Sequence, residues 1–168
     1  MLQAGFHQIP EGHLATVVTH LEMTSRPEPR STREPEGLSR VRHDAMPADS
    51  YRALFRAIGE DYLWFSRLYM TDDALNAIFQ DPGYALYTLQ REGRDLALLE
   101  LDFRQENECE LAFFGLHADL IGTGAGRFLM TQAIELAWQQ PITRFHVHTC
   151  TLDSPQALTF YMRSGFTA

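Results

Sequence analysis

The sequence predicts a mixed α/β domain built around a mostly antiparallel sheet. Three strand-like runs follow one another closely, at residues 84–90, 95–103 and 109–116, and the turns between them are only a few residues long. Strands joined by such short turns pair antiparallel, so these runs predict a meander. Helical patterns lie on both sides of the meander in the chain, and a further strand and helix follow it.

The first part of the chain contains a strand and then a linker. Residues 14–23 are rich in β-branched side chains, as strands are. Residues 25–37 contain three prolines, three arginines and three glutamates, which bury too little apolar surface to fold and predict a mobile linker. We therefore divide the chain into an N-terminal strand and Pro/Arg/Glu-rich linker (1–37) and a main domain (38–168).

The main domain is predicted to begin with a short strand at residues 38–43 and two helices. Residues 47–50 offer a helix start, apolar residues follow at helical spacing, and Gly59 stops the helix. Thr71 is expected to cap the second helix, which ends at residues 81–83.

The C-terminal part alternates between helix and strand. A helix is predicted at 124–139, a strand at 143–149 and a last helix at 154–164. Since Pro155 suits a first helical position, either Asp153 or Ser154 is expected to be the N-cap of that helix.

Length and charge exclude several classes of protein. The chain has 168 residues, which suits one domain that buries its own core. Its formal charge of −8 argues against nucleic-acid binding, which needs a basic surface. Two cysteines do not make a disulfide scaffold, and no apolar run is long enough for a membrane span or a signal peptide. We expect a cytoplasmic protein that binds no membrane.

A glycine-rich turn carries the strongest chemical signal. Residues 116–127 read as a strand end, a turn containing Gly122, Gly124 and Gly126, and a helix start. Free N–H groups and the dipole at a helix start favour an anion such as a pyrophosphate. A P-loop is excluded because no Gly-Lys-Ser/Thr follows, and a dinucleotide fold would place this turn after the first strand of a parallel sheet.

The order of motifs resembles the GNAT acetyltransferase superfamily. The family's loop, Gln/Arg-x-x-Gly-x-Gly/Ala, matches at Gly124 and Gly126, while Ile121 stands at the Gln/Arg position. Its later motif, a polar helix start followed by Tyr-x-x-x-Gly-Phe, matches residues 153–166 and includes Tyr161. The resemblance covers residues 38–166 and implies a central sheet flanked by helices, to which this chain adds an N-terminal strand.

The resemblance implies acetyl-CoA as co-substrate and acetyl transfer to a small-molecule or peptide amine. It assigns the cofactor to the backbone of Leu116, to the turn and to the later motif. The residues so implied are Leu116, Ile121, Gly122, Thr123, Gly124, Ala125, Gly126, Arg127 and Ser154. At Ile121 only the backbone contact remains, because the side chain is apolar.

Two residues are candidates for acid–base catalysis. By resemblance, Tyr161 would protonate the departing thiolate and Glu110 would take the proton of the amine. Burial beside the cofactor would raise the pKa of Glu110. Glu100 and Asp102 on the preceding strand are competing bases, since side chains two residues apart share a face.

Other polar and aromatic groups can have either a functional or a purely structural role. His146, His148 and Cys150 share one strand face, but this spacing without a fourth ligand does not predict a metal site. Either histidine is an alternative base or a substrate-steering group. Tyr62 and Trp64 line the acceptor pocket or pack in the core.

The ends of the domain raise one question about the sheet. Most family members have two further strands after Gly-Phe, whereas this sequence ends at Ala168. The strand of residues 143–149 would then be an exposed edge, which residues 14–23 can cover from the same chain or from a partner copy in a homodimer. The alternatives to an enzyme are a non-catalytic acyl-CoA-binding sensor and an inactive fragment lacking its C-terminal strands.

Overall fold

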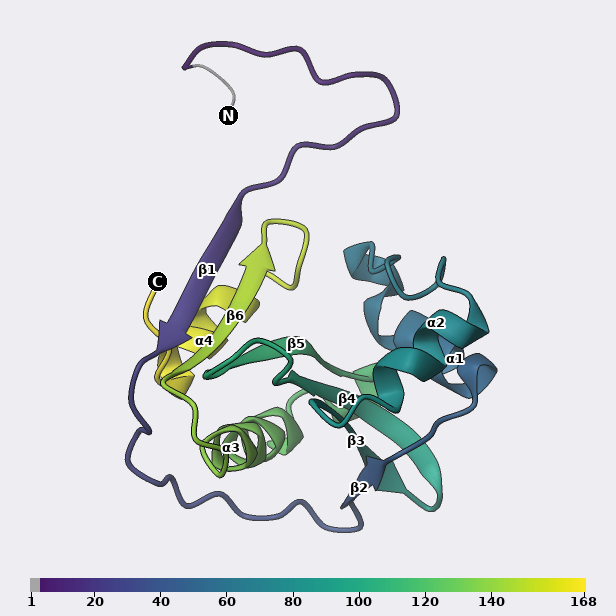
Figure 1. Cartoon of the computed structure of the whole chain (residues 1–168), viewed down its shortest axis with the longest axis vertical. Coiled ribbons are helices and arrows are strands. Elements are labelled where there is room, and N and C mark those ends of the chain that lie inside the picture. Colours follow the sequence, from purple (N-terminus) through teal and green to yellow (C-terminus); the bar gives the residue numbers. More distant parts are fainter. Residues whose placement is uncertain (1–3) are drawn as a thin grey trace.

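The protein is a six-stranded sheet with helices on both faces (Figure 1), and the computed structural model describes residues 4–168. The strand order is β1-β6-β5-β4-β3-β2, and every neighbouring pair is antiparallel except β5 and β6. The strands are β1 (Val18–Met23), β2 (Ser39–His43), β3 (Tyr84–Arg91), β4 (Arg94–Asp102), β5 (Glu108–Leu116) and β6 (Arg144–Cys150). The helices are α1 (Ala48–Gly59), α2 (Asp72–Phe79), α3 (Ala125–Ala137) and α4 (Ala157–Ser164). The predicted fold class is confirmed.

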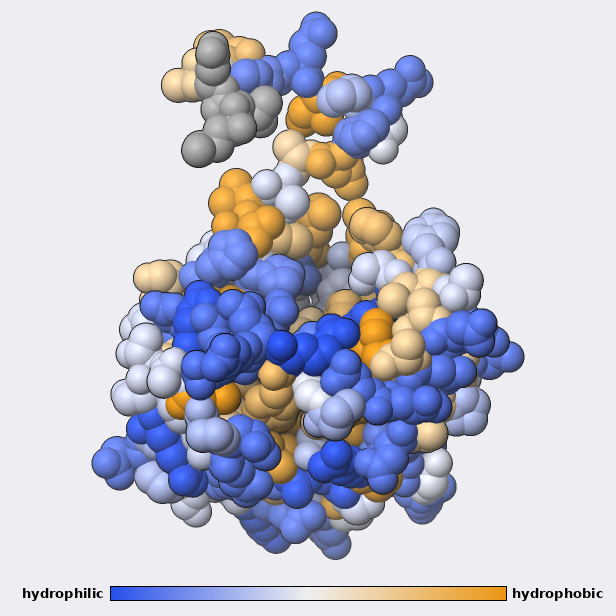
Figure 2. Space-filling view, viewed as in Figure 1, coloured by the Kyte–Doolittle hydropathy of each residue, from blue (hydrophilic) through white to orange (hydrophobic). Residues whose placement is uncertain are grey.

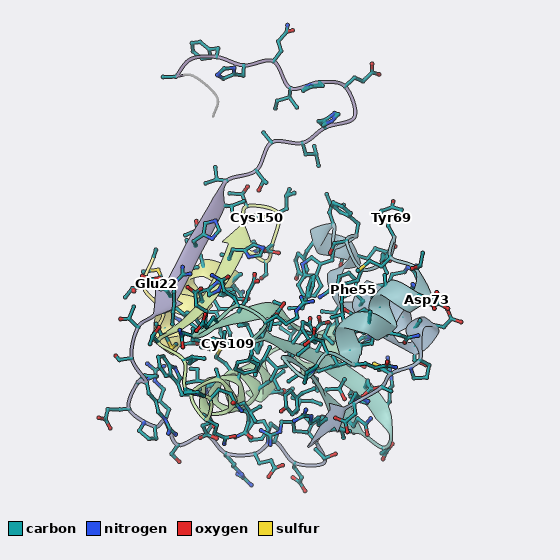
Figure 3. All side chains as sticks on the ribbon, in the orientation of Figure 1. Glu22, Phe55, Tyr69, Asp73, Cys109 and Cys150 are labelled. Atoms are coloured by element: carbon teal, nitrogen blue, oxygen red, sulfur yellow. The ribbon has the colours of Figure 1, made fainter. Side chains whose placement is uncertain are left out.

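Two hydrophobic cores lie on opposite faces of the sheet. Tyr51 and Phe55 of α1 and Leu75 of α2 pack with Leu86 and Leu98 on one face. The second core joins α3 and α4 to the other face, and its apolar side chains come from every strand except β2. Figure 3 shows Phe55 beneath α1 and α2, and Cys109 inside the body of the protein. Each face therefore has its own helix pair, and the sheet separates them.

The antiparallel meander β3-β4-β5 confirms the turn-based prediction. Glu92 and Gly93 connect β3 to β4 with φ angles of 52° and 77°. Two successive positive φ angles are typical of the tight turn whose twist suits a hairpin, and glycine adopts the second without steric cost.

The helix ends agree with the sequence except at α4. The hydroxyl of Thr71 accepts a hydrogen bond from the N–H of Ala74 (3.2 Å), so the predicted cap of α2 is confirmed. α4 begins at Ala157, and the prediction that Asp153 or Ser154 caps it is wrong. Asp153 instead accepts the N–H of Cys150 (2.8 Å) and the hydroxyl of Thr149 (2.7 Å), which closes the turn after β6.

β1 covers the edge of the sheet beside β6, within the same chain. The pairing runs from Val18 opposite Cys150 to Met23 opposite Phe145. Leu21 and Met23 point into the core under α3 and α4. The prediction that the N-terminal strand covers this edge is thus confirmed. The strand begins at Val18 rather than at Leu14, because the side chains of Leu14 and Val17 are exposed and add no core contact.

The linker spans the whole width of the sheet. It leaves β1 at one edge, passes around α3 and reaches β2 at the other edge (Figure 1). Ahead of β1, residues 4–17 project from the body and expose Phe6, Ile9 and Leu14, some of the hydrophobic atoms on the projecting segment in Figure 2. Among the described residues, no helix has the length and hydrophobicity needed to cross a membrane.

Candidate active site

β5 and β6 separate along their length and leave an opening in the sheet. Their parallel pairing covers only Glu108–Glu110 opposite Arg144–His146. Beyond this point neither strand has a partner on the other, so the backbone of residues 111–116 faces the opening. On its other side, β5 has an irregularity in its pairing with β4, between Glu100 and Leu101. A bulge of this kind increases the local twist and bends a strand away from its neighbour.

The glycine-rich turn stands where β5 ends. It follows a 3₁₀ turn (Ala118–Leu120) and leads directly into α3. Gly122 and Gly124 have φ angles of 79° and 88°, and Gly124 is the N-cap of α3. The hydroxyl of Thr123 donates to the carbonyl of Leu120 (2.8 Å), which fixes the turn. These positive φ angles explain two of the three glycines.

The turn presents backbone donors rather than side chains. Over residues 4–168, the N–H groups of Gly122, Gly124 and Gly126 have no hydrogen-bond acceptor. Gly126 has an ordinary helical φ, and a methyl group there would lie 3.5 Å from Leu116, which is a normal contact. Since packing does not demand glycine at position 126, its absent side chain leaves room for a ligand. The donors and the space suit a pyrophosphate.

The remaining cofactor candidates contribute unequally to this turn. Ala125 is fully buried at the start of α3, and Leu116 is half-buried against the same core. The side chain of Ile121 is exposed and offers no polar atom. Ser154 lies in the turn after β6, where its hydroxyl oxygen accepts from the N–H of Gln156 at 3.4 Å. It is therefore outside the glycine-rich turn.

Glu110 and His148 form an ion pair across the opening. Nδ1 of His148 lies 3.1 Å from Oε1 of Glu110, and both side chains are partly exposed. This hydrogen bond raises the pKa of His148 and lowers the pKa of Glu110 below its usual value. The expected raised pKa of Glu110 is therefore wrong, because the contact with His148 outweighs burial.

A second histidine–glutamate contact lies beside the first. Nε2 of His146 is 3.4 Å from Oε2 of Glu108, and burial lowers the pKa of His146. Arg144 contacts Glu108 (2.9 Å) and Glu22 of β1 (2.5 Å). Among residues 4–168, no group of three His, Cys, Asp or Glu side chains is arranged to hold a metal ion.

Tyr161 lies on the face of the sheet that α3 and α4 cover. It is only 8% exposed and belongs to the core beneath α3 and α4, next to the rings of Phe160 and Phe166. Burial raises its pKa well above the usual value, so the hydroxyl keeps its proton at neutral pH. Within the described part of the chain the hydroxyl has no hydrogen-bond partner. Because Cys109 and Leu111 point into this core, Glu110 points to the opposite face.

The competing base Glu100 is enclosed in a buried cluster. Its carboxylate is fully buried and accepts hydrogen bonds from Tyr51 (2.5 Å), from Tyr84 and from Arg67 (3.2 Å). A carboxylate with three partners and no exposed surface cannot reach a substrate amine. Asp102 is also engaged, because it accepts three hydrogen bonds from Arg104.

Trp64 connects the α1–α2 segment to the loop after β6. Its indole N–H donates to Oδ1 of Asp153 (3.3 Å), and its ring packs against Phe55 and Phe113. Trp64 therefore packs in the core and also contacts the loop after β6. Tyr62 is half-buried in the same segment. Sequence reasoning missed Asp153 as the partner of Trp64, because the two are 89 residues apart.

Comparison with known proteins identifies the family. The fold is that of the acetyltransferase class, with a glycine-rich turn at a helix start. The model of the acetyltransferase (GNAT) family matches residues 49–166, and the chain belongs to this family. GNAT acetyltransferases use acetyl-CoA as co-substrate. No curated protein sequence matches the chain.

Solved structures share the fold at low sequence identity. A GCN5-related N-acetyltransferase from Sphaerobacter thermophilus is 15% identical with a TM-score of 0.64, over 89% of this chain and 47% of that one. An aminoglycoside acetyltransferase from an uncultured soil metagenomic sample, in complex with trehalose, is 14% identical with a TM-score of 0.64, over 79% and 90%. The chain thus spans about half the length of the Sphaerobacter protein.

Proposed function

We propose that this protein is an N-acetyltransferase that transfers the acetyl group of acetyl-CoA to a primary amine of a small molecule or peptide. The observation that carries the proposal is the opening between β5 and β6, which has an anion-binding turn at the end of β5. The acetyl group passes by direct attack of the amine in a ternary complex. Neither cysteine suits a covalent intermediate: Cys109 is buried, and burial raises its pKa.

The residues of the site fit acetyl-CoA, which supplies an activated acetyl thioester when bound. The unpaired amides of Gly122, Gly124 and Gly126 suit the pyrophosphate, with Arg127 beside them. Thr123 and Ala125 shape this turn, and Ile121 adds only its backbone. The unpaired backbone of Leu116 offers hydrogen bonds to the pantetheine arm, as a strand edge does to an added strand. Ser154 would border the arm from the β6 side.

Two groups carry the proton transfers. Glu110 takes the proton of the attacking amine, and His148, hydrogen-bonded to it, stabilises the charge of the pair. Tyr161, which by resemblance holds the position of the family's acid, protonates the departing thiolate from the buried face. Backbone N–H groups at the Phe114–Leu116 strand end stabilise negative charge that develops on the acetyl oxygen.

The acceptor is proposed to be a cationic amine. The chain has a formal charge of −8, and an acidic protein attracts cations. A structural neighbour of the same fold is an aminoglycoside acetyltransferase, solved in complex with sisomicin. The two free cysteines fit a reducing compartment, so we propose a cytoplasmic location.

The test has a binding arm and a turnover arm. Calorimetry with acetyl-CoA should detect binding to the full chain, and a panel of amines should release free thiol that a colorimetric reagent detects. Binding without turnover on any amine would favour a non-catalytic acyl-CoA sensor. No binding would favour an inactive fragment and refute the proposed function.

A further inference from the structure

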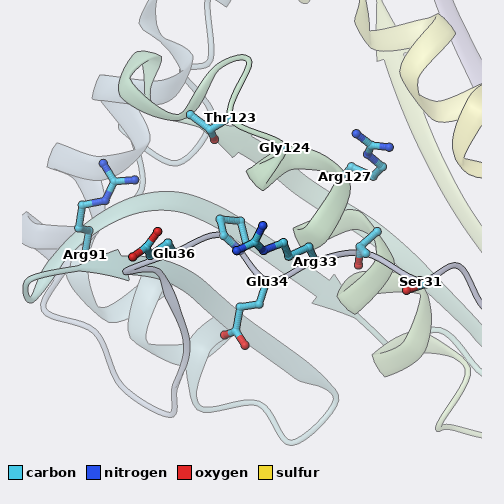
Figure 4. Close-up of a pocket in the computed structure, with 10 residues that line it drawn as sticks. Ser31, Arg33, Glu34, Glu36, Arg91, Thr123, Gly124 and Arg127 are labelled. Carbon is cyan, nitrogen blue, oxygen red and sulfur yellow. The ribbon is translucent and has the colours of Figure 1, made fainter.

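The linker and the glycine-rich turn together enclose a cavity of about 530 Å³ (Figure 4). One wall is residues 31–36 of the linker. The opposite wall consists of Thr123, Gly124 and Arg127, at the start of α3, and Arg91 comes from the end of β3. Three segments that are far apart in the sequence therefore meet beside the proposed pyrophosphate site.

Three arginines line this cavity without an acidic partner. Within the described residues, the guanidinium groups of Arg33, Arg91 and Arg127 form no hydrogen bond or ion pair. Several other arginines are paired with acids, as Arg104 is with Asp102 and Arg144 is with Glu108. Three exposed, unpaired arginines that line one cavity offer charge to an external anion.

The cavity is positive despite the acidic residues of the linker. Glu34 and Glu36 also line it, so the three arginines exceed the two glutamates by one positive charge. In Figure 4, Arg33 lies between Arg91 and Arg127, while Glu34 points away from Thr123.

We propose that Arg33 and Arg91 form a second phosphate subsite, which holds the phosphate on the ribose of the coenzyme A nucleotide. This inference rests on the proposed function. The amides of the turn and Arg127 already suffice for a pyrophosphate, so Arg33 and Arg91 are left for a further phosphate group. A guanidinium binds a phosphate through two parallel hydrogen bonds, which makes arginine suited to this task. The linker then acts as a strap that brings Arg33 across α3 to the cofactor.

The subsite predicts discrimination between two forms of the coenzyme. Calorimetry on the full chain would compare coenzyme A with 3′-dephospho-coenzyme A, which lacks only the ribose phosphate. The unmodified protein should bind coenzyme A about tenfold or more tightly, since charged hydrogen bonds contribute at that level. Arg33→Gln and Arg91→Gln should each reduce this preference and leave the Kd for dephospho-coenzyme A nearly unchanged.

A matched control and distinct failures complete the test. Arg56→Gln on α1 removes another exposed arginine outside the cavity and should leave both Kd values unchanged. Equal binding of the two coenzymes to the unmodified protein would overturn the second subsite and leave the proposed function intact. Equal weakening of both coenzymes by Arg33→Gln would also overturn it, because the arginine would then act on the pyrophosphate. Binding of neither coenzyme would refute the proposed function itself.

Discussion

Glu22 and Thr167 exchange two backbone hydrogen bonds, of 2.8 and 2.9 Å, and thereby join the first strand to the last residues of the chain. β1 is thus held by β6 on one side and by the segment after α4 on the other. Leu21, between them, is 1% exposed in the core beneath α3 and α4. The N-terminal strand is therefore an integral part of the sheet and contributes to the core.

Leu21→Ala should strongly destabilise the protein. Truncating a fully buried leucine removes apolar contacts and leaves a cavity, which costs about 2–5 kcal/mol of unfolding free energy. Val18→Ala, on the same strand but 46% exposed, should cost well under about 1 kcal/mol. Urea unfolding of both variants measures the difference. Similar midpoints for the two variants would mean that β1 does not pack against the core in solution.

Glu100→Gln should destabilise the fold without acting on the chemistry. The substitution leaves the buried guanidinium of Arg67 without its counter-ion, and breaking a buried pair costs about 3–5 kcal/mol. The exposed acid Asp73 (Figure 3) supplies the control, and Asp73→Asn should be nearly neutral. Urea unfolding gives the stabilities, and kcat is measured on the folded fraction. A large fall in kcat there would return Glu100 to the list of catalytic bases.

Local sequence patterns predicted the parts of the fold that depend on neighbouring residues. The meander follows from its short turns, the cap of α2 from Thr71, and the turn before α3 from Gly122 and Gly124. Each of these features is decided within about ten residues of chain. The wrong cap at α4 has the same origin, because Asp153 satisfies a nearby turn instead of the helix.

The candidate site depended on register and burial, which the sequence does not contain. Glu110 and His148 meet only because β5 and β6 run parallel with Glu110 opposite His146. The burial of Glu100 depends on Tyr51 and Tyr84, which arrive from other elements. Period-two spacing placed Glu100 and Asp102 on one face but could not show that both were already engaged.

The stability that His148 contributes should decrease as the pH rises. Its pKa is raised in the folded state, so its pairing with Glu110 stabilises the protein below the unfolded histidine pKa of about 6.5. That contribution is lost as the pH rises through the folded pKa. His148→Gln should therefore cost more at pH 5.5 than at pH 9, by less than about 1 kcal/mol because the pair is partly exposed.

Proton NMR titration measures the pKa of His148, and thus its pairing with Glu110, directly. The His148 ring should titrate above its usual pKa, and Glu110→Gln should bring it back down, because the carboxylate is the main cause of the shift. For the stability comparison with His148→Gln, the control is His13→Gln, which removes a histidine from the exposed N-terminal segment. An unchanged His148 titration in Glu110→Gln would show that the ion pair is absent in solution.

Tyr161→Phe should abolish most of the turnover while preserving binding. The change removes one hydroxyl that has no protein partner, so the fold and the Kd for acetyl-CoA should be nearly unchanged. Loss of a general acid lowers kcat by about 10²–10⁴-fold. Tyr69→Phe removes an exposed hydroxyl from the α1–α2 segment and should retain full activity. Unchanged kcat in Tyr161→Phe would exclude Tyr161 as the acid, and a parallel loss in Tyr69→Phe would indicate a nonspecific effect.

Gly126→Ala should weaken acetyl-CoA binding without lowering the stability of the fold. The new methyl group meets only Leu116, at 3.5 Å, and alanine favours a helix by up to about 1 kcal/mol, so unfolding free energy should stay level or rise. The same methyl group occupies the space proposed for the pyrophosphate, and acetyl-CoA binding should weaken by about tenfold, or 1.4 kcal/mol. Calorimetry and urea unfolding measure the two effects.

Gly93→Ala in the β3–β4 turn is the control. Its φ of 77° makes the substitution strained, so it should lower stability and leave the Kd for acetyl-CoA unchanged. If Gly126→Ala bound acetyl-CoA normally, the phosphates would have to lie elsewhere than at the start of α3.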